Sequence, residues 1–306
     1  MAEALSHVDA GLTRITPTFC RHIARLNLVP CDKIRRLAVF RRLFCNLVLG
    51  AMLFSATAHA EFDQSHGKLS ALLKEHVVWI SNGHASQVDY AAIKDDPSML
   101  MEYLSEVAAV TRPQYDEFSK SQQLAFLINA YNAYTIDFIL TEYPNIDSIK
   151  DLGSLFSSPW KKKLFPLLGE KHSLDEIEHE MIRKPGDFDD PRIHMAVNCA
   201  SIGCPALRNE AYVASRLDEQ LDDAVRRFLG DRSRNRADEN ALWVSKIFDW
   251  YGKDFEKQAG SVQAWLVHYA DLLSDGAQTQ SAIRSKSLRV RYLDYDWALN
   301  DIGKSN

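Results

Sequence analysis

Apolar residues recur at helical spacing along most of the chain from residue 61 onward. Residues 119–142 form the longest such stretch, and its centre, residues 124–140, is apolar nearly all round, which is typical of a buried helix. Ser173 and Glu176 form a capping box that predicts the start of another helix, and Pro185-Gly186 ends it. The remaining helices are expected over residues 68–81, 97–110, 214–229 and 262–273.

Apolar and polar residues alternate from Arg192 to Asn198, which predicts a β-strand. In such a strand, one face would carry Ile193, Met195 and Val197, and the other Arg192, His194, Ala196 and Asn198. Two further strands are predicted over residues 242–248 and 288–293, and the charged run 231–240 predicts a solvated turn. Because helices outnumber strands, we predict an α+β fold, a mainly helical single domain with a small antiparallel sheet.

The first 60 residues have the pattern of a secretory leader. A cationic segment over residues 33–42 precedes an apolar run at about 43–56, and the small residues Ala58 and Ala60 follow it. The apolar run is shorter than the ~20 residues that a membrane-spanning helix needs. We therefore expect residues 1–60 to be a leader with a cleavable signal peptide, and residues 61–306 to be one globular domain in the periplasm or outside the cell. Membrane attachment would arise only through an uncleaved signal segment.

Charge and cysteine content narrow the function further. Residues 1–60 hold eight of the 36 Lys and Arg and three of the 41 Asp and Glu, so residues 61–306 carry a formal charge of −10. A nucleic-acid-binding protein normally has a basic face, and we therefore expect no nucleic-acid partner. Of five cysteines, only Cys199 and Cys204 lie beyond the leader. In an oxidising compartment this pair is a candidate disulfide.

Polar residues stand at several positions where the pattern predicts burial. Asn129 and Asn132 lie three residues apart on the buried helix, where an unpaired amide costs about 1–3 kcal/mol. They either tie the helix to neighbouring backbone or orient a ligand. Glu178 falls on the apolar stripe of the capped helix, with His179 at its flank. A structural ion pair between Glu178 and Arg192 is the plainer alternative to a catalytic role.

The segment after the predicted strand brings possible catalytic groups together. His194 and Asn198 precede a loop that contains Cys199, Ser201 and Cys204, and these residue types are those of nucleophilic catalysis. The same groups also fit a hydrogen-bonded strand end with a disulfide-clamped turn. His172, His179 and His194 match no metal-ligand spacing, and we expect neither a metal nor another cofactor.

Several sequence blocks resemble one family of bacterial and plant proteins, the domain-of-unknown-function family 547. The blocks are 127–133 (LINAYNA), 174–179 (LDEIEH), 192–201 (RIHMAVNCAS), 203–205 (GCP), 244–251 (VSKIFDWY) and 295–300 (YDWALN). They place a family-like core at about residues 118–300. The resemblance implies a family membership and no particular activity.

A more distant similarity concerns only the order of elements. A central buried helix followed by a segment with a histidine is similar to the order in transglutaminase-like and papain-like thiol enzymes. In those enzymes the nucleophilic cysteine opens the central helix, whereas this helix has Asn129 and Asn132 and no cysteine. A thiol nucleophile in this chain would have to be Cys199.

Three functional hypotheses follow. In the first, the protein is a hydrolase or acyl-transferase for an amide-type substrate, with Cys199 as nucleophile, His194 or His179 as base and Glu178 orienting the histidine. Candidate binding residues are Asn129, Asn132, Arg192, Asn198 and Ser201, and the partner would be an unidentified small molecule or peptide. In the second, a Cys199–Cys204 disulfide stiffens a non-catalytic binding module of the cell envelope. In the third, the site is vestigial and the domain is a scaffold.

Overall fold

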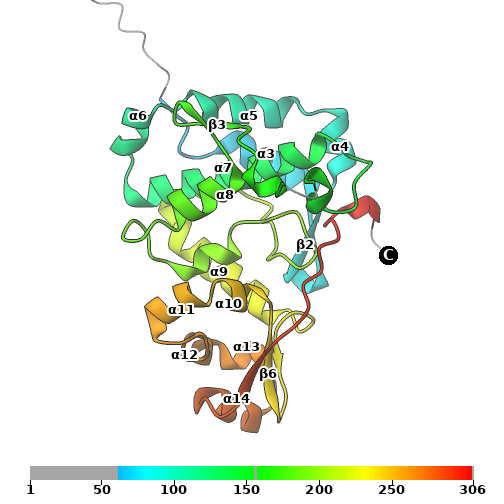
Figure 1. Cartoon of the computed structure of the whole chain (residues 1–306), viewed down its shortest axis with the longest axis vertical. Coiled ribbons are helices and arrows are strands. Elements are labelled where there is room, and N and C mark those ends of the chain that lie inside the picture. Colours follow the sequence, from blue (N-terminus) through cyan, green and yellow to red (C-terminus); the bar gives the residue numbers. More distant parts are fainter. Residues whose placement is uncertain (1–60, 155–156, 305–306) are drawn as a thin grey trace, which may run out of the picture. The chain divides into compact units, whose positions relative to one another are not determined.

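The long buried helix α7, Lys120–Leu140, lies among the other helices in the upper half of the view in Figure 1. Ser119 caps its first turn in a capping box with Gln122, and nearly every residue from Gln123 to Leu140 is buried. Helices α4 (Tyr90–Asp95), α5 (Ser98–Ala109) and α8 (Leu174–Glu176) pack around it. The prediction of a buried helix over 119–142 is therefore confirmed. The structure, a computed structural model, describes residues 61–154 and 157–304, and Phe62–Asn306 form one compact unit.

Short helices and three small sheets make up the rest of the described structure. The remaining helices are α3 (Gly67–His76), α4 (Tyr90–Asp95), α5 (Ser98–Ala109), α6 (Arg112–Glu117), α8 (Leu174–Glu176), α9 (Leu217–Gly230), α10 (Ile247–Trp250), α11 (Gly252–Ala259), α12 (Val262–Leu266), α13 (Ala270–Leu273) and α14 (Ala277–Arg284). The strands are β1 (Val77–Ile80), β2 (Ala85–Val88), β3 (Phe165–Leu167), β4 (Glu170–His172), β5 (Arg236–Ala237), β6 (Ala241–Val244) and β7 (Arg289–Tyr292). The predicted leader lies outside the described residues.

The predicted fold class, α+β and mainly helical, is confirmed. Strands β1–β2 and β3–β4 form antiparallel hairpins. In the three-stranded sheet β5–β6–β7, β5 pairs antiparallel with β6, and β7 runs parallel to β6. One hydrophobic core surrounds α7, and a second lies between α9, the three-stranded sheet and helices α10–α14.

Some predicted boundaries were wrong because two elements share one apolar run. The helix predicted over 68–81 ends at His76, and the β-branched residues that follow it form β1. The strand predicted over 242–248 ends at Val244, and Ile247 begins α10. The helix predicted over 262–273 is divided by a 3₁₀ turn into α12 and α13. The charged run 231–240 is not wholly solvated, because Asp231 and Asn235 are buried.

The strand predicted over residues 192–198 is a 3₁₀ helix, Pro191–Met195. Asp190 caps it by accepting a hydrogen bond from the backbone N–H of Arg192, and Pro191 supplies the φ angle of a first helical turn. Ile193, His194 and Met195 are all buried, so residues that alternate in polarity do not alternate in exposure. The shared polar face of His194 and Asn198 on one strand was therefore a wrong prediction.

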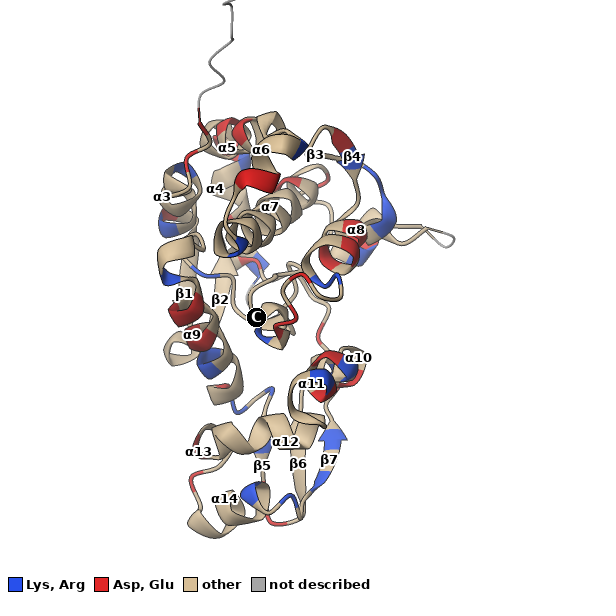
Figure 2. Cartoon of the chain, turned by 90° about the vertical axis from the view of Figure 1, so that its left-hand side faces the viewer, with Lys and Arg blue, Asp and Glu red and all other residues tan. Residues whose placement is uncertain are grey.

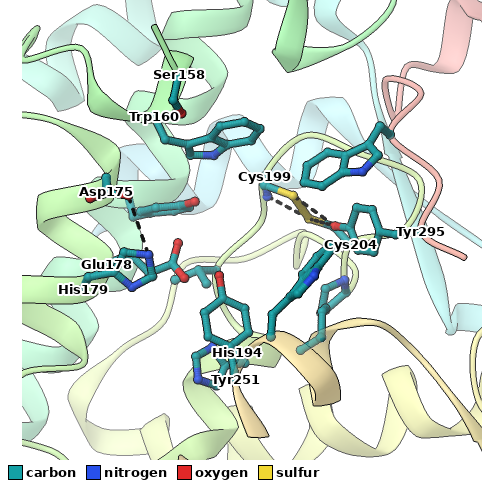
Figure 3. Close-up of a pocket in the computed structure, with 16 residues that line it drawn as sticks. Ser158, Trp160, Asp175, Glu178, His179, His194, Cys199, Cys204, Tyr251 and Tyr295 are labelled. Atoms are coloured by element: carbon teal, nitrogen blue, oxygen red, sulfur yellow. Dashed lines mark hydrogen bonds and ion pairs between the residues drawn. A yellow bond between two sulfur atoms is a disulfide. The ribbon is translucent and has the colours of Figure 1, made fainter. Parts of the chain in front are cut away.

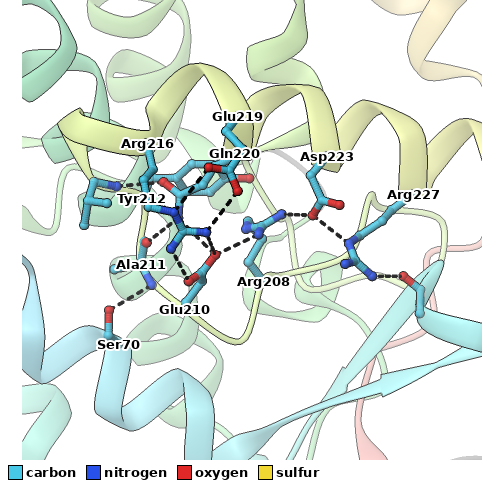
Figure 4. A network of polar contacts seen from close by, with 12 residues as sticks. Ser70, Arg208, Glu210, Ala211, Tyr212, Arg216, Glu219, Gln220, Asp223 and Arg227 are labelled. Carbon is cyan, nitrogen blue, oxygen red and sulfur yellow. Dashed lines mark hydrogen bonds and ion pairs between the residues drawn. The ribbon is translucent and has the colours of Figure 1, made fainter.

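Side chains of helix α9 form a network of ion pairs and hydrogen bonds with residues 208–210 and with the β1–β2 turn (Figure 4). Arg208 lies between Glu210 and Asp223, and Arg227 bonds both Asp223 and the carbonyl of Gly83 in the β1–β2 turn. Along the rest of the chain, acidic and basic residues are interspersed on the elements (Figure 2). Among the residues that the structure describes, no helix is both long and apolar enough to cross a membrane.

After β7, the C-terminal segment 293–301 returns along the domain to the region of α4 (Figure 1). Its end is held by Asn300, whose side-chain oxygen accepts a hydrogen bond from Tyr90, and by a bridge between Asp301 and Val88. We call residues 293–301 the C-terminal strap.

His66 gives the fold a defined acid sensitivity. Its ring is buried beside the Tyr103 hydroxyl, and burial lowers the pKa of His66 to about 4. The unfolded chain therefore binds this proton near pH 6.5 and the folded chain only near pH 4, so the free energy of unfolding should fall between those pH values as the solution is acidified. We expect His66 to account for about 3 kcal/mol of that fall.

Urea denaturation at intervals from pH 7 to pH 4 measures this dependence. His66→Gln should flatten it, and His76→Gln, at a less buried histidine at the end of α3, is the matched control. Equal slopes for wild type and His66→Gln would contradict the assignment.

Candidate functional site

One cleft collects all four residues that the sequence suggested for catalysis. Glu178, His179, His194 and Cys199 line a cavity of about 230 Å³ (Figure 3). Its other walls come from segments far apart in the sequence: Tyr131, Ser158, Trp160, Asp175, Val197, Cys204, Pro205, Ile247, Trp250, Tyr251, Tyr295 and Trp297. Helix α7, the α8 region, the loop at 199–205, helix α10 and the C-terminal strap therefore all contribute to the cleft.

Glu178 stands in a π-helical turn, Ile177–Ile182, that continues α8. Its side chain is 6% exposed, and Oε1 has no hydrogen-bond partner among the described residues. Burial, and after it the neighbouring Glu178, raise the pKa of Tyr131 and Tyr251, so both hydroxyls keep their protons beside the carboxylate. Both hydroxyls interact with the carboxylate, but Oε1 itself has no hydrogen-bond partner in the described part of the chain, and the residue lines an open cleft.

The predicted ion pair between Glu178 and Arg192 does not form. Arg192 instead bonds Asp190 and, on α9, Asp218 and Asp222. The physical reason is local, because the 3₁₀ helix places Asp190 within reach of the guanidinium two residues away. Arg192 does not line the cleft.

His194 is almost fully buried under the ring of Tyr251. The two rings stack with centroids 3.9 Å apart, and His194 Nε2 lies 2.8 Å from Oδ2 of Asp254. Burial lowers the pKa of His194, although Asp254 and Glu178 act in the opposite direction. Nδ1 of His194 has no partner within the described part of the chain. The ring is therefore held in place as a neutral base with one nitrogen still unbonded.

Asp254 was missed by the sequence analysis. It lies on α11, and Arg183 bonds both of its oxygens, at 2.7 and 3.1 Å. Burial acts to raise the pKa of Asp254, but His194 and Arg183 outweigh burial and hold that pKa well below its usual range. Nothing in the local sequence distinguishes this aspartate from its exposed neighbours on an amphipathic helix.

A chain of polar contacts continues from Arg183 to the cleft's acidic edge. Nη1 of Arg183 lies 2.7 Å from Nδ1 of His179, and Nε2 of His179 lies 3.8 Å from Asp175. Arg183 also lies over the ring of Tyr251, 4.8 Å from its centroid. Since Arg183 is occupied by Asp254 and His179, it leaves Oε1 of Glu178 without a cationic partner.

Aromatic side chains make the opposite wall. Tyr295 packs 4.5 Å from Trp297 and 4.9 Å from Trp250, and Trp160 meets Trp297 edge-on at 5.6 Å. Trp250 is 45% exposed, which is unusual for so large an apolar ring. The sequence blocks contained Trp250, Tyr295 and Trp297 but not Trp160, and only the return of the strap reveals that these residues form one surface.

The cysteine pair forms a disulfide at the edge of the cleft. The bond joins Cys199 and Cys204, whose Cα atoms are 6.3 Å apart. The hydroxyl of Tyr295 lies 3.1 Å from each sulfur, and the backbone N–H of Cys199 donates to Sγ of Cys204 at 2.9 Å. The candidate disulfide is thus present, and Cys199 has no free thiol in this state.

The candidate binding residues Asn129, Asn132, Asn198 and Ser201 do not line the cleft, and each bonds the backbone. Asn129 bonds the N–H and the carbonyl of Tyr212, and Asn132 bonds the carbonyl of Ala196 and the N–H of Asn198. The side chain of Asn198 accepts from Ala200 N–H and donates to the carbonyl of Pro205. Ser201 donates to the carbonyl of Cys199. Each of these four side chains is therefore bonded to neighbouring backbone and not to a group in the cleft.

No group of three or more His, Cys, Asp or Glu side chains in residues 61–154 and 157–304 is arranged to hold a metal ion. The polar groups of the cleft instead form hydrogen-bonded pairs, such as His194 with Asp254.

The fold and the cleft together define a mainly helical α+β domain with an aromatic-walled, disulfide-edged site. Residues 115–229 match the family described as "Protein of unknown function, DUF547", which supports the resemblance that the sequence blocks indicated. The match includes Glu178, His194 and both cysteines, and it ends before Asp254 and the strap. No curated protein and no solved structure matches the chain.

Asn198 should be worth more to stability than its size suggests. Asn198→Ala removes the buried hydrogen bonds with Ala200, Pro205 and Asn300 and leaves a backbone N–H and a carbonyl without partners, so we expect a loss of about 2–3 kcal/mol in the free energy of unfolding. Urea denaturation of the oxidised protein measures it. Asn145→Ala, at an exposed asparagine, is the matched control. A loss no larger than that of the control would show that the loop is held by other contacts.

Proposed function

We propose that the protein is a binding module of the cell envelope whose cleft takes a small ligand with an ammonium or amine group next to an apolar part. One observation carries the proposal, namely the buried carboxylate of Glu178, which lines an aromatic-walled cleft and whose Oε1 has no hydrogen-bond partner within the described residues. A ligand N–H group would supply the missing hydrogen bond, and a charged donor would form the stronger one.

The surrounding charges support a cationic ligand. Asp175 also lines the cleft, and the nearby Arg183 is already paired with Asp254. The rings of Trp250, Trp297 and Tyr295 offer faces and edges to an organic cation and its apolar part. A ligand of this kind would satisfy the carboxylate and cover the exposed face of Trp250 in the same binding event.

A matched pair of probes tests the ligand class. 2-Phenylethylamine should bind the wild-type protein and change its tryptophan fluorescence, whereas 3-phenylpropionate, with a carboxylate in place of the ammonium group, should not. Glu178→Gln should weaken amine binding about tenfold or more, as expected for loss of a charge-assisted hydrogen bond. Glu180→Gln, at an exposed residue of the same π-helical turn, should leave binding unchanged.

Equal affinity of wild type and Glu178→Gln for the amine would contradict the proposal. So would tighter binding of 3-phenylpropionate, since it would make the cleft an anion site.

Export is the second part of the proposal. A signal segment at residues 1–60 and a disulfide between the cysteines that follow it both suit an oxidising compartment. In a bacterial host that exports the full chain, mass spectrometry should find a mature N-terminus at Glu61. Replacing both Ala58 and Ala60 by Arg should leave the leader attached, because signal peptidase requires small residues at those positions. An intact leader on the wild-type protein in the periplasmic fraction would contradict this expectation.

A thiol-dependent hydrolase or acyl-transferase is the second candidate function. It is favoured by the presence of Cys199, His194, His179 and Glu178 in one cleft. It requires Cys199 to be released from its disulfide, since a bonded sulfur is not a nucleophile. Hydrolysis of an amide or thioester by the reduced protein, lost in Cys199→Ser, would favour it over the binding module.

A further inference from the structure

The loop that the disulfide spans is held by other contacts as well. Asn198 bridges its two ends, bonding Ala200 N–H at 2.9 Å and the carbonyl of Pro205 at 2.8 Å. Within the loop, the N–H of Cys204 donates to the carbonyl of Ser201 at 3.0 Å. The sulfur–sulfur bond therefore duplicates a closure that hydrogen bonds already provide.

The C-terminal strap fixes the same loop from outside. The N–H groups of Ile202 and Gly203 donate to the carbonyls of Ala298 and Asp296, both at 2.8 Å. Gly203 approaches the strap so closely that a Cβ atom at its position would lie 2.9 Å from the Asp296 carbonyl oxygen. Arg234 also bonds the carbonyl of Cys204. With this many contacts, we expect the loop to keep its shape when the disulfide is reduced.

The two sulfurs have different environments. Cys199 is partly exposed in the cleft, whereas Cys204 is 5% exposed. Sγ of Cys204 receives the backbone N–H of Cys199, and the Tyr295 hydroxyl lies 3.1 Å away. Burial raises the pKa of Tyr295, so this hydroxyl retains the proton that it donates. A thiolate formed at Cys204 would meet two donors, and an incoming thiol can reach only Cys199 readily.

We propose that the Cys199–Cys204 bridge is a reactive disulfide that oxidises a dithiol, such as a peptide with two neighbouring cysteines. A substrate thiolate attacks Sγ of Cys199, and a substrate–Cys199 disulfide forms as the Cys199–Cys204 bond breaks. The electron pair of the broken bond goes to Sγ of Cys204, which is stabilised as a thiolate by Tyr295 and the Cys199 N–H. The second substrate thiolate then attacks the substrate's own sulfur in the mixed disulfide and releases Cys199 as a thiolate.

The substrate leaves with a disulfide, and the protein retains two reduced cysteines that take up protons from water. The aromatic wall of Trp250 and Trp297 lies beside the attacked sulfur and suits an apolar residue that flanks the substrate cysteine. The reaction does not depend on what occupies the Glu178 side of the cleft, so it can be tested separately from amine binding.

Single-cysteine variants test which sulfur reacts. With oxidised glutathione as probe, Cys204→Ser should form a mixed disulfide at Cys199 at least about tenfold faster than Cys199→Ser forms one at Cys204, because Cys199 is the more exposed of the two. Mass spectrometry follows both reactions, and circular dichroism confirms that both variants are folded. Equal rates, or a faster Cys204, would overturn the proposal.

The wild-type protein provides a second test that needs no cysteine variant. Dithiothreitol should reduce the bridge while the far-ultraviolet circular dichroism stays constant. Tyr295→Phe keeps the ring but removes a donor to Cys204, and should slow this reduction about fivefold. Tyr292→Phe, at an exposed tyrosine outside the cleft, should not change the rate. Reduction only in step with unfolding, or equal rates for Tyr295→Phe and Tyr292→Phe, would assign the bridge a purely structural role.

Discussion

Two amide side chains on the buried helix α7 hold the segments that carry the cleft. An amide offers one donor group and one acceptor, which is what a stretch of backbone needs when it lies against a helix without strand pairing. Asn132 joins α7 to the backbone at Ala196 and Asn198, directly between His194 and the disulfide loop. Asn129 does the same for Tyr212 on the approach to α9. The irregular backbone around the site thereby obtains the partners that burial requires.

The cleft combines groups with different electrostatic surroundings. On one side, the Asp254 carboxylate is neutralised by Arg183 and holds His194 in position. Glu178 lies nearby without such a cation, and its neighbours are the protonated hydroxyls of Tyr131 and Tyr251. Across the cleft, the aromatic wall and the disulfide are largely apolar. One side of the cleft is therefore acidic and forms hydrogen bonds, and the other side is apolar and polarisable. This arrangement suits a ligand that is itself amphipathic.

The sequence predicted those parts of the structure that depend on local pattern. The burial of α7 followed from its apolar composition, the start of α8 from the Ser173–Glu176 pair, and the disulfide from the two cysteines beyond the leader. The predictions were wrong where contacts between distant segments determine the local structure. The alternation at 192–198 is that of a strand, yet Asp190 and Pro191 start a 3₁₀ helix there. The partner of His194 comes from α11, sixty residues further along, and no local signal marks Asp254. Similarly, the tryptophans form a wall only because the strap returns to the loop.

The return of the strap has a consequence for the order of folding. The cleft is assembled from positions as distant as Tyr131 and Trp297, and contacts of such long sequence separation carry a high entropic cost of loop closure. The buried helix α7 and both cysteines precede residues 293–301 in the chain, whereas Tyr295 lies within that segment. Before the strap docks, the bridge would therefore lack its hydroxyl neighbour and the aromatic wall. When the strap docks, the Cys199–Cys204 disulfide becomes part of the wall of the cleft. Before that step it is only a cross-link within a loop.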